Sequence, residues 1–239
     1  MSNLLDTVLE AHGGLERWRQ IKGFKADLSI TGAIWHFKGQ PDIVRQVTFE
    51  ASTREQYVKL TPFSAPDRAC IFEDGHLSLV DMDGQIVHCR KEPRDAYAGH
   101  TVDSQWDYFH AAYFCSYAVW GYFNSPFLYS YPGFVTEELT PWIEEGEQWR
   151  RLKVTFPDYL ASHCREQVSY FGADGLLRRH DYTVEVLGGA TGANYASDYQ
   201  DIDGILVPAK RRIYAYDSQG QRVDEPLLVA IDVQRFNFF

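Results

Sequence analysis

The sequence is short of positive charge. Its 23 Lys and Arg residues are outnumbered by 33 Asp and Glu residues, which gives a formal net charge of -10 at pH 7. A chain with this charge is repelled by phosphate backbones and by anionic lipid surfaces. We therefore expect no nucleic acid among its partners.

Cysteine is scarce, and no export signal is visible. The four cysteines lie far apart without a C-x-x-C pair, so we expect reduced thiols. Near the start, Asp6, Glu10 and Glu16 interrupt the apolar segment that a secretory signal would need. These absences predict a cytoplasmic protein. A signal trimmed ahead of Met1 would leave no trace in this sequence.

The short motifs of metal, nucleotide and serine chemistry are absent as well. The eight histidines show no H-x-H or H-E-x-x-H spacing, and there is no G-x-S-x-G elbow, phosphate loop or dinucleotide glycine pattern. The glycine-rich stretch 188–195 lies between predicted strands with no helix behind it, which favours a hairpin loop. We expect no cofactor and no metal.

Strand periodicity, in contrast, is abundant. Residues 1–22 are predicted to form a helical segment, with a helix that stops at Gly13-Gly14 and a short helical turn after it. Beyond Gly23, apolar residues recur at every second position, as in a strand. The alternating segments, of which the first is 24–37, form two series of predicted strands, one before and one after the middle of the chain. Asp-Gly pairs between successive strands allow tight hairpins. We predict a mainly β fold, a strongly curved antiparallel sheet of about 10–12 strands that forms a half-barrel. No linker separates the two series, so 1–239 is expected to be a single domain.

An aromatic segment lies between the two series. The stretch SQWDYFHAAYFCSYAVWGYFNSPFLYSYPGF at 104–134 carries no formal charge after Asp107. Its aromatic residues recur every three or four positions, which predicts one face of a helix from about 103 to 123. Frequent Tyr, Ser and Asn, with two prolines, argue against stable membrane insertion. We therefore predict that 103–134 is a helical insertion that covers the open side of the sheet as a lid.

The tyrosines of this segment favour a semi-polar cavity wall over a dry core, because a buried hydroxyl needs a partner. Simple packing of the helix into the core is the alternative. An exposed aromatic face would instead allow a homodimer. The residues predicted to bind a ligand from the helix are Trp106, Phe109, Tyr113, Tyr117 and Trp120.

The segment RRHDYTVEVLGG carries the strongest candidates for chemistry. Alternation places His180 and Tyr182 on the strand face that we expect to point inward. Such a pair can orient a carbonyl or transfer a proton, with help from His110 on the aromatic helix. A histidine satisfied within the core is the structural alternative.

Two further strands are expected to add to the cavity. Alternation along GANYASDYQDIDGI places Tyr195 and Tyr199 on one face, where they extend the wall formed by Tyr182. In KRRIYAY, Arg212 is a candidate for holding a ligand carboxylate at the cavity mouth. A solvated strand end is the alternative for Arg212.

The opening AHGGLERW, the long run of antiparallel strands and the segment RRHDYTVEVLGGATGANYASDYQDIDGILVPAKRRIYAY resemble a set of uncharacterised bacterial proteins. Their pattern is similar to the LolA/LppX group of lipoprotein carriers, in which a half-barrel sheet is capped by helices. The resemblance implies a cavity for acyl chains or other apolar ligands. This chain departs from the group because it shows no export signal and no lipobox cysteine near its start.

The resulting hypothesis is that the protein binds a small or elongated apolar molecule between the curved sheet and the aromatic lid. The alternative is a cofactor-independent enzyme, an isomerase, cyclase or hydrolase, that acts on a hydrophobic substrate in the same cavity.

Overall fold

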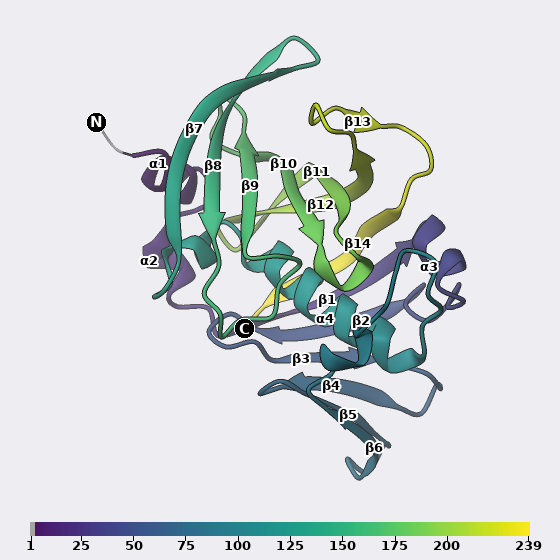
Figure 1. Cartoon of the computed structure of the whole chain (residues 1–239). Coiled ribbons are helices and arrows are strands. Elements are labelled where there is room, and N and C mark those ends of the chain that lie inside the picture. Colours follow the sequence, from purple (N-terminus) through teal and green to yellow (C-terminus); the bar gives the residue numbers. More distant parts are fainter. Residues whose placement is uncertain (1–2) are drawn as a thin grey trace.

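A computed structural model describes residues 3–239, and it shows one long antiparallel sheet wrapped around a helix (Figure 1). The helices are α1 (Leu4–Ala11), α2 (Leu15–Trp18), α3 (Ala33–Phe37) and α4 (Tyr108–Asn124), with 3-10 turns at Asp95–Tyr97, Phe127–Ser130 and Glu185–Leu187. The strands are β1 (Gly23–Thr31), β2 (Val47–Ser52), β3 (Val58–Thr61), β4 (Ala69–Glu73), β5 (His76–Val80), β6 (Ile86–Lys91), β7 (Val135–Glu144), β8 (Glu147–Thr155), β9 (Glu166–Phe171), β10 (Leu177–Val184), β11 (Ala190–Ile202), β12 (Ile205–Tyr216), β13 (Arg222–Val223) and β14 (Val229–Phe238).

The sheet follows the chain in two meanders that meet at β1 and β14. Its order is β6-β5-β4-β3-β2-β1-β14-β12-β11-β10-β9-β8-β7, with β13 paired to β12 off this path. The end strands β6 and β7 do not pair with each other, so the sheet curves without closing. This arrangement confirms the predicted mainly β half-barrel, with fourteen strands in place of the expected 10–12.

Asp-Gly turns join the strands as predicted. Asp74 and Gly75 between β4 and β5 have φ values of 47° and 71°, and Asp203 and Gly204 between β11 and β12 have 53° and 86°. Both pairs occupy the left-handed region that a two-residue hairpin requires. Local chemistry therefore sets the strand order in both halves of the sheet.

Two elements differ from the sequence prediction. The strand expected at 24–37 ends at Thr31, because Gly32 adopts φ 121° and the chain turns into α3. A Cβ at Gly32 would lie 2.4 Å from the carbonyl oxygen of Leu228, so only glycine fits this turn. Strand β7 was not predicted, because it is an edge strand with no buried residue to mark one face.

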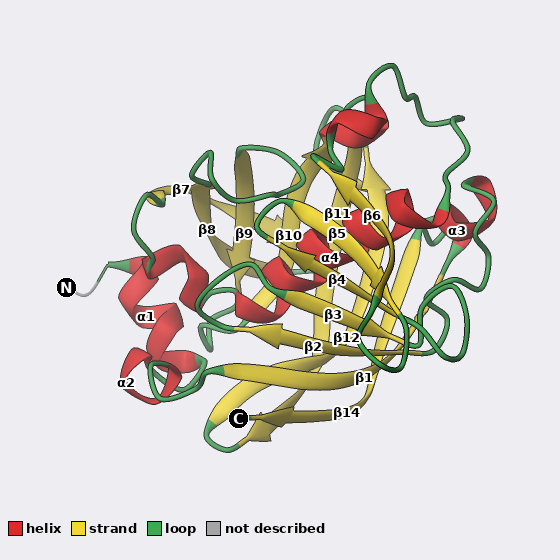
Figure 2. Cartoon of the chain, turned by 90° about the horizontal axis from the view of Figure 1, so that it is seen from below, coloured by secondary structure: helices red, strands yellow, loops and turns green. Residues whose placement is uncertain are grey.

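Helix α4 lies across the hollow of the sheet, between the limb that contains β3 to β6 and the limb that contains β8 to β12 (Figures 1 and 2). Nearly every one of its residues is buried. Asp107 begins the helix with a capping box to His110, four residues after the predicted start, and the helix ends ahead of Pro126. No helix within residues 3–239 is both long enough and apolar enough to span a membrane. That the whole chain forms a single domain stays a prediction.

Candidate functional site

A cluster of polar side chains is buried where the second half of α4 meets the sheet. We call it the concave cluster; its members are Tyr117 and Tyr122 from α4, His163 from the segment between β8 and β9, His180 and Tyr182 from β10, Asn194 from β11 and Arg211 from β12. Each is at most 5% exposed. Buried polar groups at this density are costly unless they are partnered, so their partners indicate what the cluster can do.

Hydrogen bonds link four members of the concave cluster into a chain. The Tyr122 hydroxyl bonds to His163 Nε2 at 2.8 Å and to the Tyr182 hydroxyl, and His163 Nδ1 bonds to the Tyr117 hydroxyl at 3.3 Å. The His163 ring also stacks on Tyr182, with centroids 3.9 Å apart. Burial lowers the pKa of His163 well below its usual range and raises that of Tyr182. These groups are therefore held neutral at neutral pH.

Arg211 differs from these residues because it is buried without an acidic partner. Its exposure is 1%, and none of the ion pairs formed among residues 3–239 includes it. Nη2 donates to the Tyr122 carbonyl at 2.7 Å, and Nη1 donates to Asn194 Oδ1 at 3.4 Å. The Tyr122 carbonyl needs this donor, because Pro126 has no N–H to complete the last helical turn. Arg211 Nε has no hydrogen-bond partner among residues 3–239.

His180 is the second unsatisfied member. Neither of its ring nitrogens has a hydrogen-bond partner within the described chain, although its exposure is only 3%. Burial, reinforced by the positive charge of Arg211, lowers its pKa to about 3. The imidazole is therefore neutral and keeps an unused donor and an unused acceptor.

An apolar cavity of about 60 Å³ adjoins the concave cluster. It lies between helices α3 and α4 and strands β1, β10, β11, β12 and β14, and its wall includes Ile30, Trp35, Val119, Tyr182, Gly192 and Ile213. A smaller space of about 10 Å³ is lined by both His163 and His180. The site thus combines an apolar hollow with a buried polar end.

The segment 156–165, between β8 and β9, covers the concave cluster. Gln56 holds it from across the open side of the half-barrel, accepting from the Ala161 amide at 2.9 Å and donating to the Ala161 carbonyl at 2.8 Å. Arg94 adds a bond to the Ser162 carbonyl at 3.1 Å and an ion pair with Glu185. Beside this segment lies a solvent-open cleft of about 430 Å³ that reaches Tyr113. This segment also carries His163, so displacing it would move His163 and open the other members of the concave cluster towards the cleft.

The helix residues predicted to bind ligand lie in different surroundings. Tyr117 belongs to the concave cluster, and Tyr113 lines the open cleft. Trp120 donates to the Ser52 carbonyl at 2.8 Å. Trp106 packs against Trp35 and Phe114, and Phe109 lies beneath the Arg90 guanidinium near His88. Trp120 also lines the small space beside His163 and His180, whereas Trp106 and Phe109 make packing contacts and line none of the cavities just described.

The predicted catalytic set is only partly brought together. The rings of His180 and Tyr182 lie 5.4 Å apart, as expected from their shared strand face. His110 is separated from them, because it caps the first turn of α4 and also contacts the Ala96 carbonyl at 3.1 Å. His110 and Tyr122 are twelve positions apart along α4, which corresponds to a rise of about 18 Å. His110 is therefore excluded from chemistry at His180 in this conformation.

The structure places Tyr195 and Arg212 on the opposite face of the sheet from the one predicted, whereas Tyr199 lies on the inner side. Tyr195 lies on the outer face of the sheet, where its hydroxyl donates to Glu144. Tyr199 instead packs at the inner core against His12, because Asp198 between the two tyrosines has φ 55° and interrupts the alternation of faces. Arg212 is also on the outer face and pairs with Asp232 at 2.6 Å.

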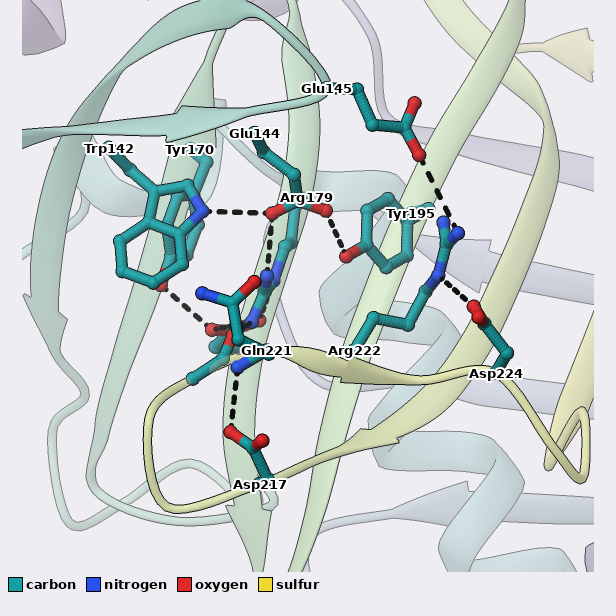
Figure 3. A network of polar contacts seen from close by, with 12 residues as sticks. Trp142, Glu144, Glu145, Tyr170, Arg179, Tyr195, Asp217, Gln221, Arg222 and Asp224 are labelled. Carbon is teal, nitrogen blue, oxygen red and sulfur yellow. Dashed lines mark hydrogen bonds and ion pairs between the residues drawn. The ribbon is translucent and has the colours of Figure 1, made fainter.

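The outer face carries a polar network of its own, centred on Arg179 (Figure 3). Arg179 has no exposed surface and makes two bonds to Asp181, at 2.6 and 2.8 Å, and one to Glu144 at 2.7 Å. Tyr170 completes the network by donating to Asp181 at 2.8 Å. Burial alone would lower the pKa of Arg179, but the bonds to Asp181 raise it above its usual range. Every charge in this network has an opposite charge beside it.

Sequence reasoning assigned no role to three members of the concave cluster, His163, Asn194 and Arg211, whereas Tyr122 is one of the tyrosines of the aromatic segment that were expected at a cavity wall. Arg211 carried a usable signal, since alternation places it with Ile213 on the apolar face of KRRIYAY. His163 carried none, because it lies outside any strand. Within residues 3–239, no group of three or more His, Cys, Asp and Glu side chains is arranged to hold a metal, and all four cysteines are free thiols.

The fold matches solved structures, whereas no protein-family model and no curated protein matches the chain. A LolA superfamily protein from Nitrosomonas europaea is 8% identical, with a TM-score of 0.55 over 100% of this chain and 94% of its own. A DUF1329 family protein from Desulfovibrio piger is 12% identical, with a TM-score of 0.52 over 98% of this chain and 91% of its own. A putative outer membrane lipoprotein-sorting protein domain from Vibrio parahaemolyticus is 10% identical, with a TM-score of 0.50 over 96% of this chain and 91% of its own. The chain therefore has the LolA-like half-barrel fold that the resemblance predicted.

Proposed function

We propose that the protein binds an apolar molecule between α4 and the curved sheet. The observation that carries this proposal is the apolar cavity beside α4, whose wall continues directly into the concave cluster. Ligand sites are typically apolar hollows with a few convergent polar groups, and this arrangement has both features. The lipoprotein-sorting description of one solved neighbour is consistent with an apolar ligand.

The cavity volume sets a condition on binding. A space of about 60 Å³ is well below the roughly 300–1,000 Å³ of a typical ligand pocket. An elongated ligand therefore requires α4 or segment 156–165 to move outward. The two bonds between Gln56 and Ala161, and the bond from Arg94 to Ser162, are the contacts that such a movement breaks.

Native mass spectrometry of protein purified without detergent tests this proposal. We expect an apolar adduct, one per chain, that denaturing extraction releases for identification. Ala118 lines the cavity, and the Ala118→Leu variant fills part of it, so this variant is expected to lose the adduct. Ala98→Leu adds the same side chain at an exposed position and is expected to keep it. A clean apo mass together with no binding of added decanol would contradict the proposal.

Catalysis in the same cavity is the second candidate. The hydrogen-bonded chain from Tyr182 through Tyr122 to His163 favours it, because it could relay a proton. The low pKa of His180, about 3, makes that imidazole a weak base at neutral pH, and for this reason we rank binding first. If an adduct is identified and the protein converts it, Tyr182→Phe is expected to abolish turnover while the adduct still binds. Unchanged turnover in Tyr182→Phe and His180→Ala would exclude these residues as catalytic.

The cellular location and the oligomeric state stay predictions. Fractionation of cells that express the full chain tests the cytoplasmic location, and recovery outside the cytoplasm would overturn it. Sedimentation at several protein concentrations tests the homodimer, which requires a sedimentation coefficient that rises with concentration.

A further inference from the structure

We propose that Arg211 and His180 form a buried site for the anionic head group of the ligand, so that the protein selects amphiphiles with a carboxylate or phosphate head over neutral ones. This inference rests on the proposed apolar-ligand function. It adds the chemical class of the ligand and the orientation in which the ligand lies.

The first argument is the unbalanced charge of Arg211. A buried guanidinium normally has a carboxylate beside it, because an unpaired charge in a protein interior is strongly destabilising. The bonds of Arg211 to the Tyr122 carbonyl and to Asn194 provide acceptors but no negative charge. An anion placed against this side chain would supply the missing charge.

The second argument is that two neighbouring side chains have unused hydrogen-bonding atoms. In the part of the chain that the structure describes, neither Arg211 Nε nor either ring nitrogen of His180 has a hydrogen-bond partner. A role for Arg211 as the C-terminal cap of α4 explains the bond from Nη2 to Tyr122, but it leaves Nε and His180 unexplained. Oxygen atoms of a carboxylate or phosphate would accept from both residues.

The third argument is the register of the strands, which places the apolar cavity next to these groups. On β10, β11 and β12, the cavity-lining residues Tyr182, Gly192 and Ile213 each lie two positions from His180, Asn194 and Arg211. Two residues along a strand span about 6.6 Å and return to the same face of the sheet. A ligand with its head at Arg211 would therefore have its apolar tail in the cavity.

Gly192 makes room for the Tyr182 ring at the boundary of the apolar cavity. It pairs with Tyr182, and a Cβ at this position would lie 2.4 Å from Tyr182 Cε2. The missing side chain lets the Tyr182 ring lie over β11, where the ring forms part of the boundary between the polar end and the apolar hollow.

Binding of three probes with the same chain length tests the inference: decanoate, decyl phosphate and decanol. We expect one or both anions to bind at least about tenfold more tightly than decanol to the wild-type protein. The tighter of the two anions identifies the head group. We expect Arg211→Met to bring all three affinities within about threefold of one another, because the positive charge is removed while the cavity remains.

A second variant and a matched control complete the design. Arg211→Gln keeps a donor for the Tyr122 carbonyl, so it serves the same purpose if Arg211→Met does not fold. Arg212→Gln removes the neighbouring arginine, which is on the outer face and paired with Asp232, and is expected to keep the anion preference.

The outcomes separate the two levels of the hypothesis. Equal binding of all three probes to the wild type, or an anion preference that persists without Arg211, would overturn the head-group site and leave the apolar-ligand function in place. No binding of any probe would overturn the proposed function and, with it, this inference.

Discussion

Arg179 and Arg211 are both buried arginines of one sheet, but they lie on opposite faces and in opposite electrostatic situations. Arg179, on the outer face, has two carboxylates within 2.8 Å. Arg211, on the inner face, has a backbone carbonyl and an amide oxygen. The first site is complete by itself, which is typical of a structural network. The second has an uncompensated charge next to a cavity, which is typical of a place where a ligand belongs.

The adjacent residues Arg179 and His180 show how this difference arises. Alternation along β10 sends consecutive side chains to opposite faces, so one strand contributes to both environments. The hairpins β7–β8 and β12–β13 extend over the outer face and bring Glu144 and the Gly220 carbonyl to Arg179 (Figure 3). On the inner face α4 contributes Tyr122 and no acid.

The largest expected effect is the loss of stability when the outer network is broken. Arg179→Met leaves Asp181 and Glu144 buried without their cation, so we expect the free energy of unfolding to fall by about 3–5 kcal/mol. Urea denaturation followed by tryptophan fluorescence measures this change. As a control, Arg222→Met removes a half-buried arginine from the rim of the same network and is expected to cost less than about 1 kcal/mol. A loss below 1 kcal/mol for Arg179→Met would contradict the structural role of the network.

A smaller effect is expected from the neutral histidine of the inner face. His180 has a folded pKa of about 3, below its unfolded value of 6.5, so below pH 6.5 only the unfolded chain gains a proton there. Its contribution to stability is thus complete above pH 6.5 and is lost as the pH falls, by about 1.4 kcal/mol per pH unit. The His180→Leu variant lacks this imidazole, so between pH 6 and pH 4 its free energy of unfolding should fall less steeply with decreasing pH, by that amount per pH unit.

Urea denaturation at a series of pH values measures the slope for wild type and variant. The exposed His36 offers the matched control, because His36→Leu changes no buried imidazole. Parallel profiles for wild type and His180→Leu would show that His180 is not held neutral in the folded protein. His12, whose pKa burial lowers to about 4, contributes in the same direction and remains in both proteins.

The smallest effect is expected for Arg211 in the absence of ligand. Arg211→Met loses the bond to the Tyr122 carbonyl, but it also relieves the burial of an unpaired charge, so we expect a change within about 1 kcal/mol. Measured beside Arg179→Met, this variant sharpens the contrast between the two faces. A loss as large as that of Arg179→Met would mean that Arg211 is a structural residue, and it would remove the main support for an anion site.

Much of the fold could be predicted because its signals are local. Apolar alternation marks strands that have one buried face, and Asp-Gly pairs at 74–75 and 203–204 mark hairpins whose backbone they allow. Strand β7 lacked such alternation, and α3 was hidden because a single glycine at position 32 ends the strand before it. Local patterns also placed His180 and Tyr182 correctly on one face.

The candidate site could be predicted only in part, because its members come from distant parts of the chain. Tyr122 and His163 are 41 residues apart, and their hydrogen bond depends on how α4 and the segment 156–165 pack together. Alternation along the sequence predicted Tyr195 and Tyr199 on one face of β11, but the positive φ of Asp198 interrupts that alternation. No periodicity in the sequence contains these contacts.

The sequence by itself therefore determined the curved antiparallel sheet, its turns and the aromatic helix within it, because propensity, alternation and turn chemistry act between near neighbours. Only the tertiary structure decided which charges are compensated. Arg179 obtains Glu144 from a hairpin that folds over the outer face, whereas Arg211 meets a helix that brings no acid. The physical reason is that the cost of a buried charge depends on what packs against it in three dimensions.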